Sequence, residues 1–422
     1  MQRFGRPSTG DVIAGVSVAL VAIPQSLAYA ELAGMPPQYG LWATALPSLL
    51  AALFVSSRYL QTGPVALTAL LTFGALSPLA TESSAEYIEM AALLALLVGG
   101  MRVLLGLGRL GRVAYLLSPP VLVGFTTAAA ILILSSQLPK AFDVDPDRGG
   151  VLHNAFDALA HPGRWSLTAM LFAAMTLVMI FGGRLLHRLF PGVLAAVVVG
   201  LVISSASGYG GSIVGELDGG FISLGVEFPW SRTADLIVPA LAIALVGFAE
   251  PASIARTFAR LDREPWDANR EMVSQGVANL AAGVSGAFPV GGSFSRSSLN
   301  RMAGATSAWA GAITGAFVLL TLPLTPVLRD LPQAILGAIV IGAVAKLINL
   351  RGLWDLRHRG TPHLLVGAAT LAATLATAPR VERGVIVGIA VSLAVERIGR
   401  VPLGDGDHDN DVTQPTEAAS SA

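Results

Sequence analysis

Two ionisable residues interrupt apolar stretches of the sequence, and they are the first candidates for chemistry. Glu250 lies in the otherwise apolar run 236–255. Arg296 lies in a second, shorter run, 293–303, three residues after its start. Because an ionisable group is costly among apolar neighbours, it is a candidate functional group by default. A guanidinium can bind an anion. A carboxyl among apolar groups favours its neutral form, which suits it to carry a proton.

Each of these residues also has a structural interpretation. Protonated Glu250 could form a hydrogen bond to a neighbouring helix, and Arg296 could neutralise Glu250 or extend towards the membrane surface. Gln25 and Tyr29 are four residues apart and share a helix face, so they either line a cavity or join two helices. Ser295 could donate a hydrogen bond to an anion, or it could serve in helix packing.

The composition predicts a membrane protein and excludes several kinds of site. Of the 422 residues, 53% are hydrophobic and 13% are charged, about half of the ~25% typical of soluble proteins. Lys+Arg and Asp+Glu both number 27, so net charge indicates no nucleic-acid partner. There is no cysteine, and all six histidines fall in loops, the tail or helix ends. We therefore expect no metal, no cofactor and no intramembrane hydrolase, which would need a serine–histidine or aspartate pair.

Apolar runs long enough to cross a lipid bilayer recur along the whole chain. A crossing helix needs about 20 residues. Two shorter runs, 64–78 and 293–303, are too broken to cross alone and are predicted to be half-helices. With these two, we predict fourteen segments; the other twelve lie near 11–30, 37–54, 87–107, 113–135, 166–183, 190–206, 234–255, 269–287, 306–323, 332–348, 362–378 and 381–396.

The loop charges predict the orientation of these segments. If the N-terminus is cytoplasmic, most Lys and Arg residues, Arg102 among them, fall on cytoplasmic loops or ends, as the positive-inside rule requires. Glu31 is then predicted to be a solvated residue at the outer end of the first span. We expect both termini in the cytoplasm, a location in the plasma (cell inner) membrane, and a disordered tail at 401–422.

Two halves of seven segments suggest an inverted repeat. Residues 18–21 resemble 243–246, and this offset places Gln25 opposite Glu250. The two short segments each open on a break, at 63–64 and at 291–293. A helix that begins near the membrane centre exposes unpaired N–H groups and a positive dipole end, which together can bind an anion.

Several motifs resemble the sulfate permease (SulP) family of anion transporters. The stretches 22–30, 34–41, 61–64 and 291–297 carry the resemblance. It implies an all-α integral membrane fold, shared with nucleobase permeases, in residues 1–400. Segments 1–4 and 8–11 would form a core domain, and segments 5–7 and 12–14 a gate domain. The anion would lie between the N-termini of segments three and ten, with family site positions at Gln25, Tyr29, Val65, Phe294, Ser295 and Arg296.

The resemblance leaves the coupling ion and the substrate open. Relatives usually continue into a cytoplasmic STAS domain, whereas only the short tail follows the last predicted span here. Some sodium-coupled relatives have Asp at the position of Glu250 and a Thr one turn on, where this chain has Ile254. We therefore expect proton-coupled symport of sulfate, bicarbonate or a dicarboxylate such as fumarate, with Glu250 as proton carrier. A passive channel, an uncoupled exchanger and a nucleobase permease are the alternatives, and a homodimer is compatible with the family.

Overall fold

A computed structural model describes residues 5–111, 118–145, 149–187, 190–217, 220–222 and 227–399. The predicted tail at 401–422 lies outside the described residues. In the first half of the chain, the elements are α1 (Thr9–Leu32), α2 (Gln38–Phe54), β1 (Thr62–Gly63), α3 (Ala66–Leu76), α4 (Ala85–Leu107), α5 (Pro119–Phe142), α6 (Val151–Ala160), α7 (Leu167–Leu186) and α8 (Gly192–Ser207).

The second half repeats this order of two helices, a two-residue strand and six helices, apart from short 3₁₀ turns. Its elements are α9 (Thr233–Asp262), α10 (Ala268–Val284), β2 (Gly291–Gly292), α11 (Phe294–Met302), α12 (Trp309–Thr321), α13 (Gln333–Val344), α14 (Leu350–Arg359), α15 (Thr361–Ala376) and α16 (Glu382–Gly399). The 3₁₀ turns are η2 (Pro162–Arg164), η3 (Trp230–Arg232), η4 (Leu322–Leu328) and η5 (Ala345–Leu347).

Each of the fourteen predicted apolar runs overlaps one helix. Six stretches of the described residues are long and apolar enough to cross a membrane unaided: Thr9–Leu32, Ala85–Leu107, Pro119–Phe142, Trp230–Asp262, Trp309–Leu328 and Gln333–Arg359. The remaining apolar helices are shorter. The sequence analysis missed α6 and α14, which fall between the predicted runs.

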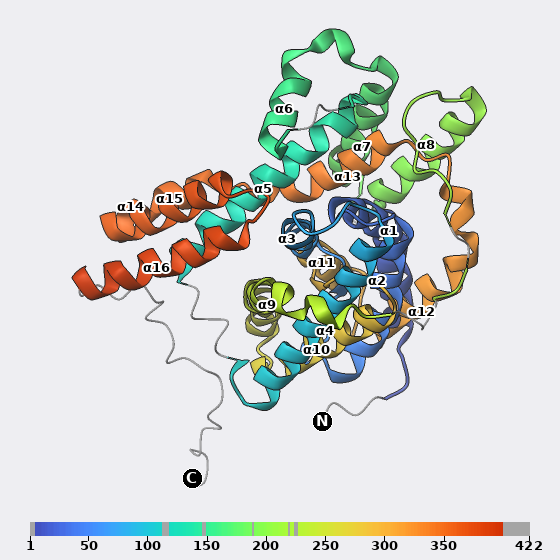
Figure 1. The fold of residues 1–422 in the computed structure, drawn as a ribbon. Coiled ribbons are helices and arrows are strands. Elements are labelled where there is room, and N and C mark those ends of the chain that lie inside the picture. The colour runs from blue at the N-terminus through green and yellow to red at the C-terminus, as the bar shows by residue number, and fades with distance from the viewer. Residues whose placement is uncertain are drawn as a thin grey trace.

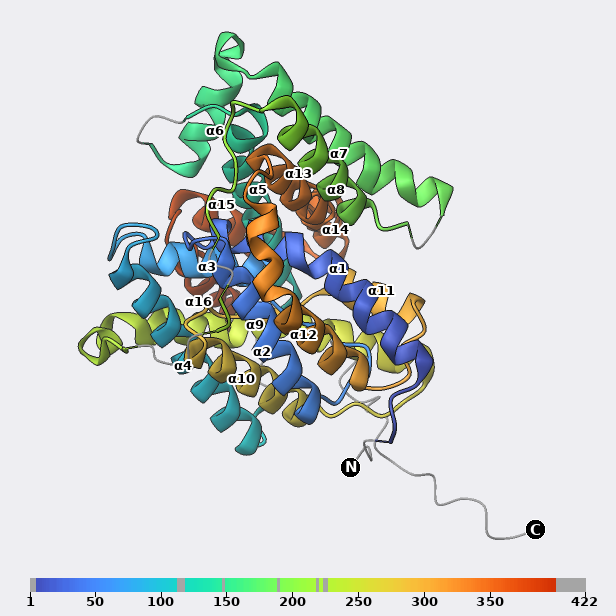
Figure 2. The same cartoon turned by 90° about the vertical axis from the view of Figure 1, so that its right-hand side faces the viewer.

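The helices form two groups (Figures 1 and 2). α1–α4 and α9–α12 pack together in the lower part of Figure 1, while α5–α8 and α13–α16 lie above them or to their left. Packing partners in one half have counterparts in the other: α2 packs on α12 as α10 packs on α4, and α5 packs on α15 as α13 packs on α7. The short helices α3 and α11 both pack against α1 and α9, so those two long helices flank them.

Glycines allow α4 and α10 to pack very closely. A Cβ at Gly99 of α4 would lie 2.6 Å from the backbone nitrogen of Leu280, and one at Gly276 of α10 would lie 2.7 Å from that of Val103. Real Cβ atoms do not approach backbone so closely. Small residues at such contacts are what membrane helices use to bring their backbones together.

Two charged residues differ from the sequence prediction. Arg102 is not at a loop or helix end; it lies within α4 and is 0% exposed. Glu31 is not solvated either, because its side chain is 9% exposed and its Oε2 accepts a hydrogen bond from Lys140 Nζ at 2.6 Å. Both corrections have one cause: each side chain is long enough to reach a partner on another helix, which position in the sequence does not reveal.

Candidate functional site

The two predicted breaks meet in space. β1 and β2 pair in antiparallel fashion, with Thr62 opposite Gly292 and Gly63 opposite Gly291. α3 and α11 begin directly after these strands, so the N-termini of both short helices lie at one junction. With 11 and 9 residues, they are about 17 Å and 14 Å long, roughly half of a ~30 Å hydrocarbon layer.

Side chains from α2 and α10 support this junction. On the β1 side, Ser48 Oγ donates to the Thr62 carbonyl oxygen at 2.6 Å, and Gln275 Nε2 donates to Thr62 Oγ1 at 2.8 Å. On the β2 side, Asn279 Oδ1 accepts from the backbone nitrogen of Val290 at 3.0 Å, and Asn279 Nδ2 donates to its carbonyl oxygen at 3.1 Å. The bonds to Thr62 and Val290 backbone atoms satisfy groups that so short a strand pair leaves unpaired.

Glycines on both strands allow other groups to lie close to the junction. Gly63 has φ +152°, which favours glycine, and a Cβ there would lie 3.1 Å from Arg296 Nη1. A Cβ at Gly292 would lie 2.8 Å from Leu60 Cδ1 and 3.0 Å from Pro251 Cβ. The guanidinium of Arg296 therefore packs directly against the backbone of β1.

Arg296 is buried with part of its hydrogen-bonding capacity unused. It is 1% exposed, and its Nη2 donates to the Pro64 carbonyl oxygen at 2.7 Å. Its Nε and Nη1 are buried and have no partner among the described residues. A buried donor without a partner costs about 1–3 kcal/mol, so this cation is well suited to receive an anion from outside the protein.

Glu250 and Tyr29 lie near this cation. Glu250 on α9, Tyr29 on α1 and Arg296 on α11 lie within electrostatic range of one another. Glu250 is partly buried, and among the described residues no ion pair within 4 Å joins it to Arg296. Gln25, one turn before Tyr29, is 5% exposed, and its Oε1 has no partner among the described residues.

The remaining predicted residues occupy the starts of the two short helices. Val65 is the N-cap of α3 and is 6% exposed. Phe294 opens α11, is 55% exposed and stacks on Phe258 of α9 with ring centroids 6.2 Å apart. Ser295 is exposed, and its Oγ lies 3.3 Å from Ser293 Oγ. The structure thus gathers the predicted residues on α1, α3, α9 and α11 around one junction.

The sequence analysis overlooked Arg102. Its Nε and Nη2 donate to the carbonyl oxygens of Ala244 and Ile243 in α9, at 3.1 and 2.9 Å, and its Nη1 donates to that of Val290 at 3.1 Å. No carboxylate within the described residues pairs with it. The signal was present, because Arg102 lies five residues inside the apolar run 87–107, but it was counted with the charges at the end of that run.

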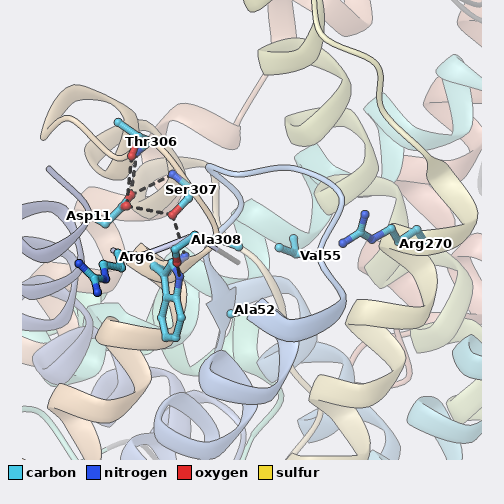
Figure 3. A pocket seen from close by; sticks show the side chains of 10 residues that line it. Arg6, Asp11, Ala52, Val55, Arg270, Thr306, Ser307 and Ala308 are labelled. Carbon is cyan, nitrogen blue, oxygen red and sulfur yellow. Dashed lines mark hydrogen bonds between the residues drawn. The ribbon is translucent and has the colours of Figure 1, made fainter. Parts of the chain in front are cut away.

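A separate cavity of about 340 Å³ lies where α1, α2, α10 and α12 begin or end (Figure 3). Beside it, Asp11 Oδ1 accepts from the backbone nitrogens of Thr306 and Ser307 at 2.8 and 2.9 Å, which ties α1 to the start of α12. None of the predicted site residues lines this cavity. The predicted site residues therefore lie at the junction of β1 and β2, away from this cavity.

Comparison with known protein families shows to which family the chain belongs. The model of the "Sulfate permease family" matches residues 9–370. The chain belongs to the sulfate permease family. A probable sulfate transporter of Mycobacterium tuberculosis is 36% identical over 405 residues, which cover 93% of this chain and 70% of that protein. Solute carrier family 26 member 6 of Homo sapiens is 31% identical over 97% of this chain and 58% of its own length.

Two solved structures show a similar helical fold. The structure of SLC26A9 superposes with a TM-score of 0.85 at 24% identity, covering 92% of this chain and 65% of that chain. The transmembrane domain of a cyanobacterium bicarbonate transporter superposes with a TM-score of 0.77 at 22% identity, covering 91% and 97%. This sulfate permease family member is thus an all-helical, multi-pass membrane protein, and its relatives are transporters rather than enzymes.

Proposed function

We propose that this sulfate permease family member is a secondary active transporter of small anions, which binds its substrate between the N-termini of α3 and α11. The observation that carries the proposal is Arg296, a buried cation with two unpartnered donor atoms at the meeting point of two helix N-termini. Helix N-termini and guanidinium donors both favour negative charge.

The surrounding residues have distinct proposed roles. Gln25 and Tyr29 on α1 and Ser295 on α11 offer polar groups to the anion, while Val65 and Phe294 form apolar walls that limit its size. A pocket that binds a small ligand commonly combines a few placed polar groups with apolar walls in this way.

The position of Glu250 supports the proposal of proton coupling. When its carboxyl is charged, it partly neutralises Arg296, and when it is protonated, the positive charge of Arg296 is free to act on an anion. Anion and proton therefore each strengthen the binding of the other, since coupling between two sites is reciprocal. The side chain of Ile254, one turn further along α9, has no oxygen that could bind a sodium ion, and this favours coupling to protons over coupling to sodium.

For the movement, we propose a core domain of α1–α4 and α9–α12 that shifts against a gate domain of α5–α8 and α13–α16. The shared element order and matching packing partners of the two halves support a seven-plus-seven inverted repeat. The fourteen segments, with α3 and α11 as half-helices, would comprise all helices except α6 and α14, which are short and amphipathic. The distribution of Lys and Arg favours cytoplasmic termini in the plasma (cell inner) membrane, and a homodimer is compatible with this arrangement.

Sulfate, bicarbonate and dicarboxylates such as fumarate are the proposed substrates. Relatives of the chain are named as sulfate transporters, and a protein of similar fold as a bicarbonate transporter. A nucleobase permease is disfavoured, because the sequence of α11, FSRSSLNRM, offers Arg296 and no carboxylate to hold a neutral base.

Uptake into proteoliposomes tests the proposal. Labelled sulfate, bicarbonate and fumarate would each be supplied under an inward proton gradient, an inward sodium gradient, or neither. We expect at least one anion to accumulate above its external concentration under the proton gradient alone. Uptake that only ever reaches equilibrium would instead indicate a channel or an uncoupled exchanger, and accumulation driven by sodium alone would contradict proton coupling.

A further inference from the structure

Arg102 is a buried cation outside the proposed anion site, and its three hydrogen bonds join three separate parts of the chain. Its guanidinium links α4, on which it lies, to Ile243 and Ala244 of α9 and to Val290, the residue before β2. Val290 is followed directly by the Gly291–Gly292 strand and by the start of α11. Ala244 lies six residues before Glu250 on the same helix.

The fit around Arg102 is close. The glycine-mediated contact of α4 with α10 brings the α4 backbone near the junction, and Gly247 of α9 leaves room for the side chain. A Cβ at Gly247 would lie 2.7 Å from Arg102 Nη2, so any larger residue there must displace the guanidinium.

Satisfying backbone groups does not explain why this residue is an arginine. The carbonyls of Ile243 and Ala244 lie inside α9, where the N–H groups four residues on are available to them. The Val290 carbonyl already accepts from Asn279 Nδ2 at 3.1 Å. An apolar side chain would therefore leave none of the three carbonyls unpaired, and it would avoid the cost of burying a charge without a carboxylate partner.

We propose that Arg102 is a positioning residue, which sets the start of α11, and thus Arg296, relative to Glu250 on α9. The planar fork of a guanidinium can hold three acceptors in fixed directions, whereas a lysine ammonium is a compact charge on a flexible stem. The inference rests on the proposed function, because the geometry that Arg102 sets is that of the proposed anion and proton groups.

Four variants separate positioning from mere stability. Arg102→Met removes the charge and all three hydrogen bonds. Arg102→Lys keeps the charge, but its ammonium cannot hold all three acceptors in the directions that the guanidinium does. Gly247→Ala keeps the arginine but displaces its guanidinium. Arg109→Met, which changes an exposed arginine just beyond α4, is the matched control. Each purified variant would be measured for thermal stability, for equilibrium binding of labelled sulfate, bicarbonate and fumarate, and for hydrogen–deuterium exchange of the peptide 288–297.

In folded Arg102→Met we expect about tenfold weaker anion binding, on the scale seen when groups that orient a bound ion's ligands are removed, and faster exchange in 288–297. Arg102→Lys and Gly247→Ala should lie between this variant and the wild type, and Arg109→Met should match the wild type. If Arg102→Met does not fold, the other two variants carry the test.

Two results would overturn the positioning role: wild-type affinity in the folded variants, whatever their exchange, or unchanged exchange in 288–297. If the wild type itself binds none of the three anions, the proposed function is what fails. The exchange measurement then decides only whether Arg102 sets the start of α11: faster exchange in 288–297 supports that part of the role, and unchanged exchange refutes it.

Discussion

At the scale of single residues, the charges around the strand junction are what the proposed anion site depends on. Arg296 and Glu250 were predicted from the sequence because an isolated charge in a long apolar run is conspicuous. Arg102 was missed because it lies near the end of such a run, where a long side chain can extend either to the surface or to the interior. Which of the two it does depends on the glycines of the facing helices, far away in the sequence.

Replacing Glu250 tests proton coupling at this scale. In the wild type, anion binding should strengthen as the pH falls and Glu250 becomes protonated, because the positive charge of Arg296 is then uncompensated. Glu250→Gln mimics the protonated form, so its anion affinity should no longer depend on pH and a proton gradient should no longer drive accumulation. Glu86→Gln, at an exposed ion pair with Arg232, serves as control. Gradient-driven uptake that survives in Glu250→Gln would refute the assignment.

At the scale of elements, the helices were predictable and their meeting points were not. The apolar runs predicted every α-helix among the described residues except α6 and α14. These two are ten residues long and too polar on one face to appear as apolar runs. The pairing of β1 with β2 joins residues about 230 positions apart in sequence, and no local pattern indicates such a contact. The glycines that mark both breaks did indicate where the chain leaves the helical conformation.

Two neighbouring glycines of α4 provide a matched test of the α4–α10 contact. Gly99→Ala places a Cβ 2.6 Å from the backbone of α10, whereas a Cβ at Gly100 has nothing within 4 Å. Overpacking of this kind costs about 1–3 kcal/mol, so Gly99→Ala should lower the apparent Tm by several degrees. Gly100→Ala should leave it unchanged or raise it slightly, because alanine favours helix. Equal Tm values for the two variants would mean that the helices are packed less tightly than described.

At the scale of the whole molecule, the ion pair between Lys140 and Glu31 joins α5 to α1 and so connects the two groups of helices. It lies at the ends of these helices that we propose to face the outer side. We further propose that this pair, because it holds the core to the gate there, favours a state in which the outer side is closed.

Breaking this pair should therefore open the outer side more often. Because the chain has no cysteine, Val65→Cys provides a single reporter at the proposed site. We expect a membrane-impermeant thiol reagent, added from outside, to label Val65→Cys faster when Lys140→Met is also present. Exchanging the two charges, with Lys140→Glu and Glu31→Lys together, should restore slow labelling. An unchanged labelling rate in Lys140→Met would show that the ion pair does not control access.

Anion binding to purified protein tests the central proposal most directly. Saturable binding of labelled sulfate, bicarbonate and fumarate would be compared in the wild type, in Arg296→Met and in Arg301→Met, which removes the other arginine of α11, exposed and paired with Asp262. We predict that at least one anion binds to the wild type and to Arg301→Met, and that its binding is lost in folded Arg296→Met. Binding of equal affinity in Arg296→Met would contradict a site between the N-termini of α3 and α11.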